Sequence, residues 1–289
     1  MSSLLVKRGS AQICYYQSTF VVNVVMKLVT GLYIYPVKSL GGIEVNSANV
    51  TLRGLEYDRR WMLVDEQHQF LTQRTFPQLA LLRTAINHGR LNIFELGNPG
   101  NIIDLELVPT TGMELQVQIW EDECTAWHIN PTIDSWFSVK LNRRVKLVYM
   151  PDSSLRQVDL NYAKPGDITG FADGYPVLII GQSSLDDLNS RLSDPVPMQR
   201  FRPNIVFTGG IPFEEDTMSK FHIGDIEFHG IKPCGRCEIT TVDQDRGVAG
   251  KEPLRTLSTY RVKNNKVMFG QNVICANEGP IQVGEHIRE

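Results

Sequence analysis

The sequence predicts a mainly β fold of the α+β kind, built from two β-barrel-like parts with few helices. Short runs rich in Val, Ile, Leu, Tyr and Trp recur along the 289 residues, and Gly, Pro, Asn or Asp separate many of them. This spacing favours a barrel or sandwich over a doubly wound α/β fold. The chain shows neither a Gly-rich dinucleotide motif nor a Walker loop. A hydrophobic content of 42% supports packed cores.

The strand-like runs cover most of the first half of the chain. They are LVTGLYIYPV, WMLVD, FLTQR, RLNIFEL, IIDLELV, ELQVQIW and VKLVYM. The polar run 66–69 between the second and third indicates a hairpin turn. Near the end, FHIGDIEF (221–228) and IQVGEHIR (281–288) share one apolar and glycine pattern. Two glycine turns on the rim of one barrel would produce such a repeat.

Three helices are expected. The first covers residues 131–141 and opens with a proline, which suits the first helical position. The second covers residues 183–194, with Ser183 or Ser184 as its cap and three leucines on one face. Its free N–H groups would form an anion site. A third, short helix is expected over residues 252–261.

The predicted organisation has four segments. Residues 1–25 are expected to be a flexible extension outside the fold, without the cleavage site of a signal peptide. Residues 26–150 form an N-terminal β-barrel domain, the polar segment 151–175 connects, and residues 176–289 form a second domain. No apolar run is long enough to span a membrane.

Charge and cysteine usage narrow the class of protein. A net charge of −3 argues against nucleic-acid binding. The cysteines are odd in number and scattered, which is not the pattern of a disulfide scaffold and predicts a cytoplasmic setting. They are Cys14, Cys124, Cys234, Cys237 and Cys275.

The stretch KPCGRCEITTVD, residues 232–243, carries the most reactive side chains. A structural zinc site wants more ligands than Cys234 and Cys237 supply. A thioredoxin-type pair needs a helix after the first cysteine, and EITTVD looks strand-like instead. Two readings remain: a thiolate ligand or nucleophile favoured by the neighbouring Lys232 and Arg236, or two buried apolar thiols.

Cationic side chains close to predicted strand ends favour a site for an anion. YPVKSLGG places Lys38 and Ser39 in a turn, and YDRRWM offers Arg59. RFRPNIV places Arg202 and Asn204 before a strand that precedes the cysteines. Each alone reads as a solvated charge, but together they can hold a phosphate beside a sulfur ligand.

Several motifs in one order give the sequence a family resemblance. They are YPVKS, DRRWMLVD, SSLDDLN, RFRPNIV, IGDIEF, PCGRCEITTVDQDRG, KEPLRTL and VGE. Over about residues 28–288 the chain resembles the MOSC proteins that carry a MOSC N-terminal β-barrel domain. These include the mitochondrial amidoxime-reducing component and its bacterial relatives. The resemblance implies that residues 26–150 are the N-terminal β-barrel domain and residues 176–289 the MOSC domain.

The resemblance also implies a molybdenum cofactor, a pterin that chelates the metal through a dithiolene and ends in a phosphate. It assigns Cys237 as the catalytic metal ligand and Asp243 as a catalytic group near the substrate, while Cys234 need not be a ligand. The implied cofactor-binding residues are Lys38, Ser39, Arg59, Ser184, Arg202, Asn204, Gly235 and Arg236. We expect them to line a basic, water-filled cleft between the domains, with Cys237 at its floor.

By this resemblance the chain is an oxidoreductase that reduces N-hydroxylated compounds. With no C-terminal cysteine cluster in the sequence, a separate electron-transfer protein is expected to supply the electrons. An alternative is a sulfur-carrier or cofactor-carrier module that uses a cysteine thiol, as in the cofactor sulfurase. That sulfurase has a further domain using pyridoxal phosphate, for which this sequence shows no candidate. A third reading is a member that has lost its cofactor and only binds proteins.

Overall fold

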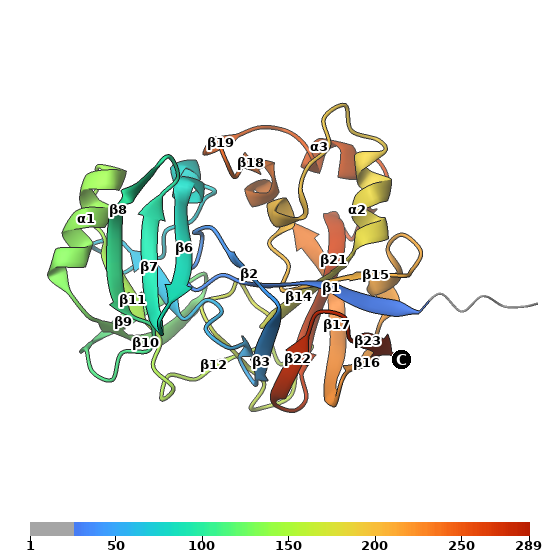
Figure 1. The fold of residues 1–289 in the computed structure, drawn as a ribbon, viewed down its shortest axis with the longest axis horizontal. Coiled ribbons are helices and arrows are strands. Elements are labelled where there is room, and N and C mark those ends of the chain that lie inside the picture. Colours follow the sequence, from blue (N-terminus) through green and yellow to red (C-terminus); the bar gives the residue numbers. More distant parts are fainter. Residues whose placement is uncertain (1–25) are drawn as a thin grey trace, which may run out of the picture.

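The computed structural model describes residues 26–289 and confirms a mainly β fold with few helices (Figure 1). The expected extension over residues 1–25 lies outside the described residues. The described helices are α1 (Pro131–Leu141), α2 (Gln182–Asn189) and α3 (Leu254–Leu257). Within residues 26–289, no helix combines the length and apolar character that crossing a bilayer requires.

A closed barrel forms the C-terminal half of the fold. Its strands follow the order β14, β15, β1, β23, β16, β17 and β21, and β21 pairs back onto β14. Closure leaves no open edge in the ring. The bounds are β1 (Lys27–Ile34), β14 (Val177–Gly181), β15 (Ile205–Thr208), β16 (Lys220–Ile223), β17 (Ile226–Arg236), β21 (Lys266–Cys275) and β23 (His286–Arg288).

Two open sheets and α1 form the N-terminal half (Figure 1). One sheet has the order β6, β7, β8 and the other β5, β11, β10, β9. Their bounds are β5 (Trp61–Val64), β6 (Leu82–Asn87), β7 (Arg90–Glu95), β8 (Asn98–Glu106), β9 (Met113–Ile119), β10 (Asp122–His128) and β11 (Lys146–Tyr149).

Short strands complete the fold. β3 lies between β22 and β4, β12 pairs with β13, β18 with β19, β2 with β1 and β20 with β21. Their bounds are β2 (Ile43–Val45), β3 (Ser47–Thr51), β4 (Gly54–Leu55), β12 (Arg156–Gln157), β13 (Ile168–Thr169), β18 (Val242–Asp243), β19 (Val248–Ala249), β20 (Val262–Lys263) and β22 (Gly279–Gln282). The 3-10 helices are η1 (Pro77–Leu81), η2 (Met198–Phe201), η3 (Glu214–Thr217) and η4 (Glu238–Thr241).

Each half has its own apolar core. In the barrel, Phe221 and Phe228 stack with ring centroids 5.4 Å apart, and Ile179 and Phe207 are fully buried beside them. The N-terminal core centres on Trp61, whose ring lies against that of Tyr149. Burying aromatic side chains of this size is a large part of what stabilises a β fold. One further cluster of buried apolar side chains lies in each half.

Strand pairing does not follow the order of the sequence. β1 pairs with β15 and β23, and β3 pairs with β22, so the start of the described chain belongs to the C-terminal sheets. Figure 1 shows the blue β3 beside the red β22. The division into residues 26–150, 151–175 and 176–289 stays a prediction. Because β3 and β4 belong to the sheet of β22 and β5 belongs to an N-terminal sheet, the chain passes from one half to the other between β4 and β5.

The predicted hairpin turn and the predicted pair of glycine turns have different outcomes. The turn at residues 66–69 is confirmed, because Val64 bridges Phe70 in antiparallel fashion. Both repeated glycines, Gly224 and Gly284, adopt positive φ angles, 56° and 93°. They lie between β16 and β17 and between β22 and β23, but β22 pairs with β3 outside the ring. Only the first of the two turns therefore joins two strands of the ring.

α1 begins at its predicted residue, α2 begins one residue early at Gln182, and α3 begins two residues late at Leu254. α1 matches the predicted range, and the Asn130 side chain accepts the N–H of Thr132 at its start. α2 ends at Asn189, earlier than predicted, and its cap residue is Gly181. The predicted capping by Ser183 or Ser184 is wrong. A buried carboxylate beside α2 takes the Ser184 hydroxyl instead.

A bulge in β17 gives a test of the barrel packing. At Gly230 an added Cβ would lie 1.8 Å from the carbonyl oxygen of Met218, a backbone atom that cannot move away freely. We expect Gly230→Ala to lower the free energy of unfolding by about 2–3 kcal/mol. Urea denaturation measures this loss. Gly100→Ala is the control, since no atom lies within 4 Å of its added Cβ; equal losses in both variants would contradict the packing described.

Candidate functional site

Cys237 lies where the barrel strand β17 ends. It is the cap residue of the 3-10 helix η4, and the hydroxyls of Thr240 and Thr241 donate to the carbonyls of Cys237 and Glu238. These bonds explain why EITT forms a helical turn, so the expectation that it is strand-like is wrong. The turn leaves the thiol partly accessible at the end of the strand.

Arg74 brings a cation to this thiol from the N-terminal half. Its Nε donates to Cys237 Sγ at 3.2 Å, and its Nη2 donates to Asp173 at 2.8 Å. The guanidinium lies 4.7 Å from the centroid of the Trp120 ring, an arrangement that holds the arginine in place. The arginine thus links the Cys237 sulfur to the carboxylate of Asp173.

Asp173 joins this arginine to Lys38. Lys38 Nζ donates to Asp173 at 2.5 Å and to the carbonyl of Phe171 at 2.8 Å, and the lysine is only 6% exposed. Burial lowers the pKa of Lys38 to about 8, although Asp173 opposes this change. Burial alone would raise the pKa of Asp173, but Lys38 and Arg74 hold it well below its usual range. Two cations thus share one carboxylate.

Arg59 and Arg202 form a second pair of cations, and both lie against the ring of one tyrosine. Their guanidinium carbons lie 4.5 Å and 4.2 Å from the centroid of the Tyr35 ring. Arg59 pairs with Asp58 at 2.6 Å and donates to Asn204 at 3.1 Å. Asn204 in turn holds the strand β1 through the carbonyl of Tyr33. Asp58 therefore neutralises the charge of Arg59, whereas Arg202 forms no ion pair with a carboxylate among residues 26–289.

Arg202 is the least satisfied of these cations. It is 7% exposed, and its Nη1 donates to the carbonyl of Leu40 at 2.7 Å. Its Nη2 is buried and has no hydrogen-bond partner within residues 26–289. Burial lowers the pKa of Arg202 to about 10. A buried N–H of a cation without a partner is costly, and an anionic ligand would remove that cost.

Backbone strain marks three of the predicted residues. Ser39, Arg59 and Arg202 have φ angles of 68°, 49° and 56°. Residues other than glycine rarely adopt this left-handed conformation, and such strain tends to occur at functional sites. The carbonyl of Ser39 accepts from Gln73, which also bonds Gln244 of the other half. The strained turns are thus held from both halves.

Gly235, Arg236 and Asp243 are predicted site residues of the same motif as Cys237. Arg236 donates to Cys234 Sγ at 3.1 Å and to the carbonyl of Phe201, and Gly235 is exposed beside it. Asp243 lies 3.6 Å from Arg200, whose Nη1 donates to the carbonyl of Thr241. These contacts hold both ends of the motif to other residues of the C-terminal half.

Ser184 is the predicted residue that the structure does not bring to this group. Its hydroxyl donates to Glu215 at 2.7 Å and accepts from the N–H of Phe213. Neither of these partners hydrogen-bonds to the cations described above. Burial raises the pKa of Glu215 to about 7. The carboxylate at the start of α2 takes the place that an anion was expected to occupy.

Sequence reasoning missed Arg74, Asp173 and Tyr35. Arg74 ends the strand-like run FLTQR, and Tyr35 lies within the first strand-like run, LVTGLYIYPV. Asp173 lies in the polar segment 151–175. Lys38 stands out because it follows a strand in a turn, and Arg74, at the end of a strand-like run, carries a similar signal.

A cavity of about 490 Å³ opens next to Arg74. Arg74 from one half and Glu238, Thr241 and Leu254 from the other form part of its wall. The sequence predicts Cys237 at the floor of a basic cleft. In the structure, the residues that line this cavity include Glu238, which follows Cys237 in the chain, and Arg74, which donates to its sulfur.

Fold and site together define a two-part β protein in which a closed barrel presents a cation-bound thiol to its neighbouring domain. The model of the MOSC N-terminal beta barrel domain matches residues 26–144, and that of the MOSC domain matches residues 167–288. The chain belongs to the family of MOSC proteins with this N-terminal domain, which includes the mitochondrial amidoxime-reducing components.

The similarity to individual relatives extends over most of this chain. Mitochondrial amidoxime-reducing component 1 of Mus musculus is 31% identical over 90% of this chain and 81% of its own length. The Homo sapiens protein of the same name is 32% identical over 90% and 82%. Molybdenum cofactor sulfurase of Oryza sativa subsp. japonica is 33% identical over 88% of this chain. This chain spans only 33% of the sulfurase.

The buried ammonium of Lys38 makes stability depend on pH. Because burial lowers the pKa of Lys38 from 10.5 to about 8, the folded protein binds fewer protons there than the unfolded chain between these values. The stability of the wild type relative to Lys38→Met should therefore rise from pH 8 to 10.5, by up to about 3 kcal/mol. Urea denaturation across this range measures the difference, with Lys263→Met, on an exposed lysine, as control. A flat difference would be inconsistent with a buried charged lysine.

Proposed function

We propose that this protein binds a molybdenum cofactor and reduces N-hydroxylated compounds. The observation that carries the proposal is the Cys237 thiol, held by Arg74 beside buried cations that outnumber their carboxylate partners. Supporting it, relatives of similar length are named amidoxime-reducing components, and another is named molybdenum cofactor sulfurase. The cytoplasmic location stays a prediction.

The residues present fit such a group. A thiolate is a soft ligand of the kind that sulfur-seeking metals prefer, so Cys237 is the proposed protein ligand of the metal. Lys38, Arg59 and Arg202 would hold the phosphate, and the free Nη2 of Arg202 offers it a donor. Ser39 and Asn204 would contact the pterin. A hydrogen bond from Arg74 to the ligating sulfur would tune its electron density.

The reaction consumes two electrons and two protons. The N–O bond of the substrate breaks, and the reduced nitrogen compound and water leave. The cofactor supplies the two-electron chemistry when bound, and a separate electron-transfer protein supplies the electrons. Asp243, held by Arg200 at 3.6 Å, is the candidate group for moving a proton. Arg74 and Lys38 keep the surroundings cationic, which favours the binding of electron-rich ligands.

Sulfur transfer is the second candidate. It is supported by the 33% identity to the cofactor sulfurase over 88% of this chain. In this function Cys237 would carry a sulfane sulfur as a persulfide, and Arg74 would stabilise its anion. Purified protein would then contain cyanide-labile sulfur in place of stoichiometric metal.

Metal and pterin content separate these candidates. After expression in a molybdate-fed host, we expect nearly one molybdenum and one pterin per chain in the wild type. Cys237→Ala removes the proposed ligand and should lower the molybdenum content at least about tenfold, since a lost metal ligand usually costs that much in affinity. Elemental analysis and fluorescence of the oxidised pterin measure both.

The matched control is Cys234→Ala, which removes the neighbouring thiol that Arg236 rather than Arg74 contacts. It should retain the wild-type metal content. Equal loss in the two variants would reject Cys237 as the specific ligand. Absence of molybdenum from the wild type in a competent host, together with labile sulfur, would replace the reductase proposal with sulfur transfer.

A further inference from the structure

The cavity beside Arg74 has a charged side and an apolar side. Its volume of about 490 Å³ suits a small organic molecule. Arg74 lies at the end toward Cys237, because it lines the cavity and also donates to the thiol. A substrate whose N–O group approaches this end would place the rest of its body in the cavity.

Two cations in the lining have no partner. Lys251 and Arg255 line the cavity, and neither forms an ion pair with another residue that the structure describes. Both side chains are exposed to solvent. The backbone N–H of Arg255 donates to the carbonyl of Lys251, which places the two residues one turn apart. Their charges therefore act on the same part of the cavity.

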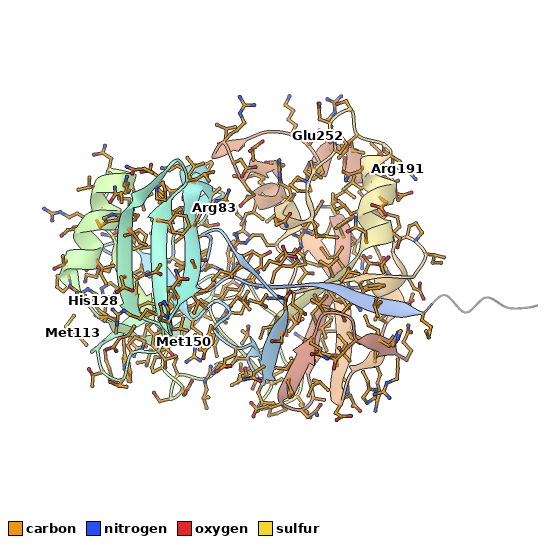
Figure 2. The ribbon with its side chains drawn as sticks, viewed as in Figure 1. Arg83, Met113, His128, Met150, Arg191 and Glu252 are labelled. Atoms are coloured by element: carbon orange, nitrogen blue, oxygen red, sulfur yellow. The ribbon has the colours of Figure 1, made fainter. Side chains whose placement is uncertain are left out.

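The lining carries fewer carboxylates than cations. Glu238 is the single carboxylate among the described lining residues. Glu252, labelled in Figure 2, is outside the lining, and its carboxylate accepts the backbone N–H of Thr256. Arg74 already shares Asp173 with Lys38. The unshared charges in the lining are thus two positive and one negative.

An apolar surface lies next to these cations. Val242, Leu254 and Val267 line the same cavity, with Ala249 at its side. Val242 is fully buried and sits beneath the cavity as part of the protein interior. An aromatic ring or short alkyl group packed there would remove apolar surface from water.

We propose that the preferred substrates are N-hydroxylated compounds that carry an apolar body and an anionic group, such as a carboxylate. This inference rests on the proposed function and names the substrate class of the same site. The N–O group points to Arg74 and Cys237, the body packs on Leu254 and Val267, and the anion is held by Lys251 and Arg255. Two exposed cations, each contributing a few-fold, give about a tenfold gain in affinity.

Two compounds that differ only in a carboxylate test this directly. Benzamidoxime is neutral, and 4-carboxybenzamidoxime carries an anion opposite its N–O group. Calorimetry on the full chain loaded with cofactor gives the dissociation constant of each. We expect the carboxylated compound to bind about tenfold more tightly at low salt. The ratio should fall severalfold at about 0.5 M salt, because salt screens exposed charges.

Substitutions test whether Lys251 and Arg255 cause the preference for the carboxylated compound. The double variant Lys251→Gln, Arg255→Gln should bring the ratio of the two dissociation constants close to one. Lys263→Gln, a matched change on an exposed lysine outside the lining, should leave the ratio unchanged. Equal affinities in the wild type, or a ratio that survives high salt and the double variant, would overturn the inference.

Calorimetry combined with an assay for reduction of the same two compounds separates this inference from the proposed function on which it rests. Reduction of both compounds with equal affinities would retain the reductase proposal and reject the anion preference. Preference for 4-carboxybenzamidoxime without any reduction would retain the anion site and reject the reductase. The non-reducible 4-carbamoylbenzoate should bind in competition with the carboxylated substrate, and failure to compete would also count against the anion site.

Discussion

Burial of positive charge without enough negative charge is the constraint on which the structure of this site depends. Lys38 and Arg74 share Asp173, Arg59 uses Asp58, and Arg202 has no carboxylate partner among the described residues. Each buried cation costs desolvation energy that only nearby anions or hydrogen-bond acceptors recover. The protein meets part of this cost with carbonyl oxygens and with the face of Tyr35. An anionic ligand would meet the rest.

The fold concentrates these charges where its two halves meet. Arg74 comes from the N-terminal half and Cys237 from the end of a barrel strand, yet they are 3.2 Å apart. Arg83, at the edge of β6 that faces the barrel half in Figure 2, donates to Gln244 and Asp245 of the same boundary. Because β1 is a strand of the barrel and Lys38 follows it, the chain crosses this boundary early. Neither half alone contains the thiol and all of its cationic neighbours.

The sequence predicted the barrel class. It also predicted five of the proposed cofactor-binding residues that the structure groups, because turns at strand ends concentrate functional side chains. Lys38, Ser39, Arg59, Arg202 and Asn204 all follow or precede strands. Long-range pairing was not predictable from local pattern, so the sequence could not show that Arg74 contacts both Cys237 and Asp173. Ser184 was misplaced because a cap signature says nothing of a buried glutamate contributed by a distant segment.

The most direct test of the charge surplus is the melting temperature of cofactor-free protein with and without inorganic phosphate. A ligand that binds only the folded state raises this temperature, because it stabilises that state by an amount that grows with the logarithm of the ligand concentration above its Kd. We predict a clear rise for the wild type and little or none for Arg202→Gln, which removes the cation with the free Nη2. Arg144→Gln, on an exposed arginine of the other half, should respond like the wild type. An equal rise in Arg202→Gln, or none in the wild type, would contradict an anion site at this boundary.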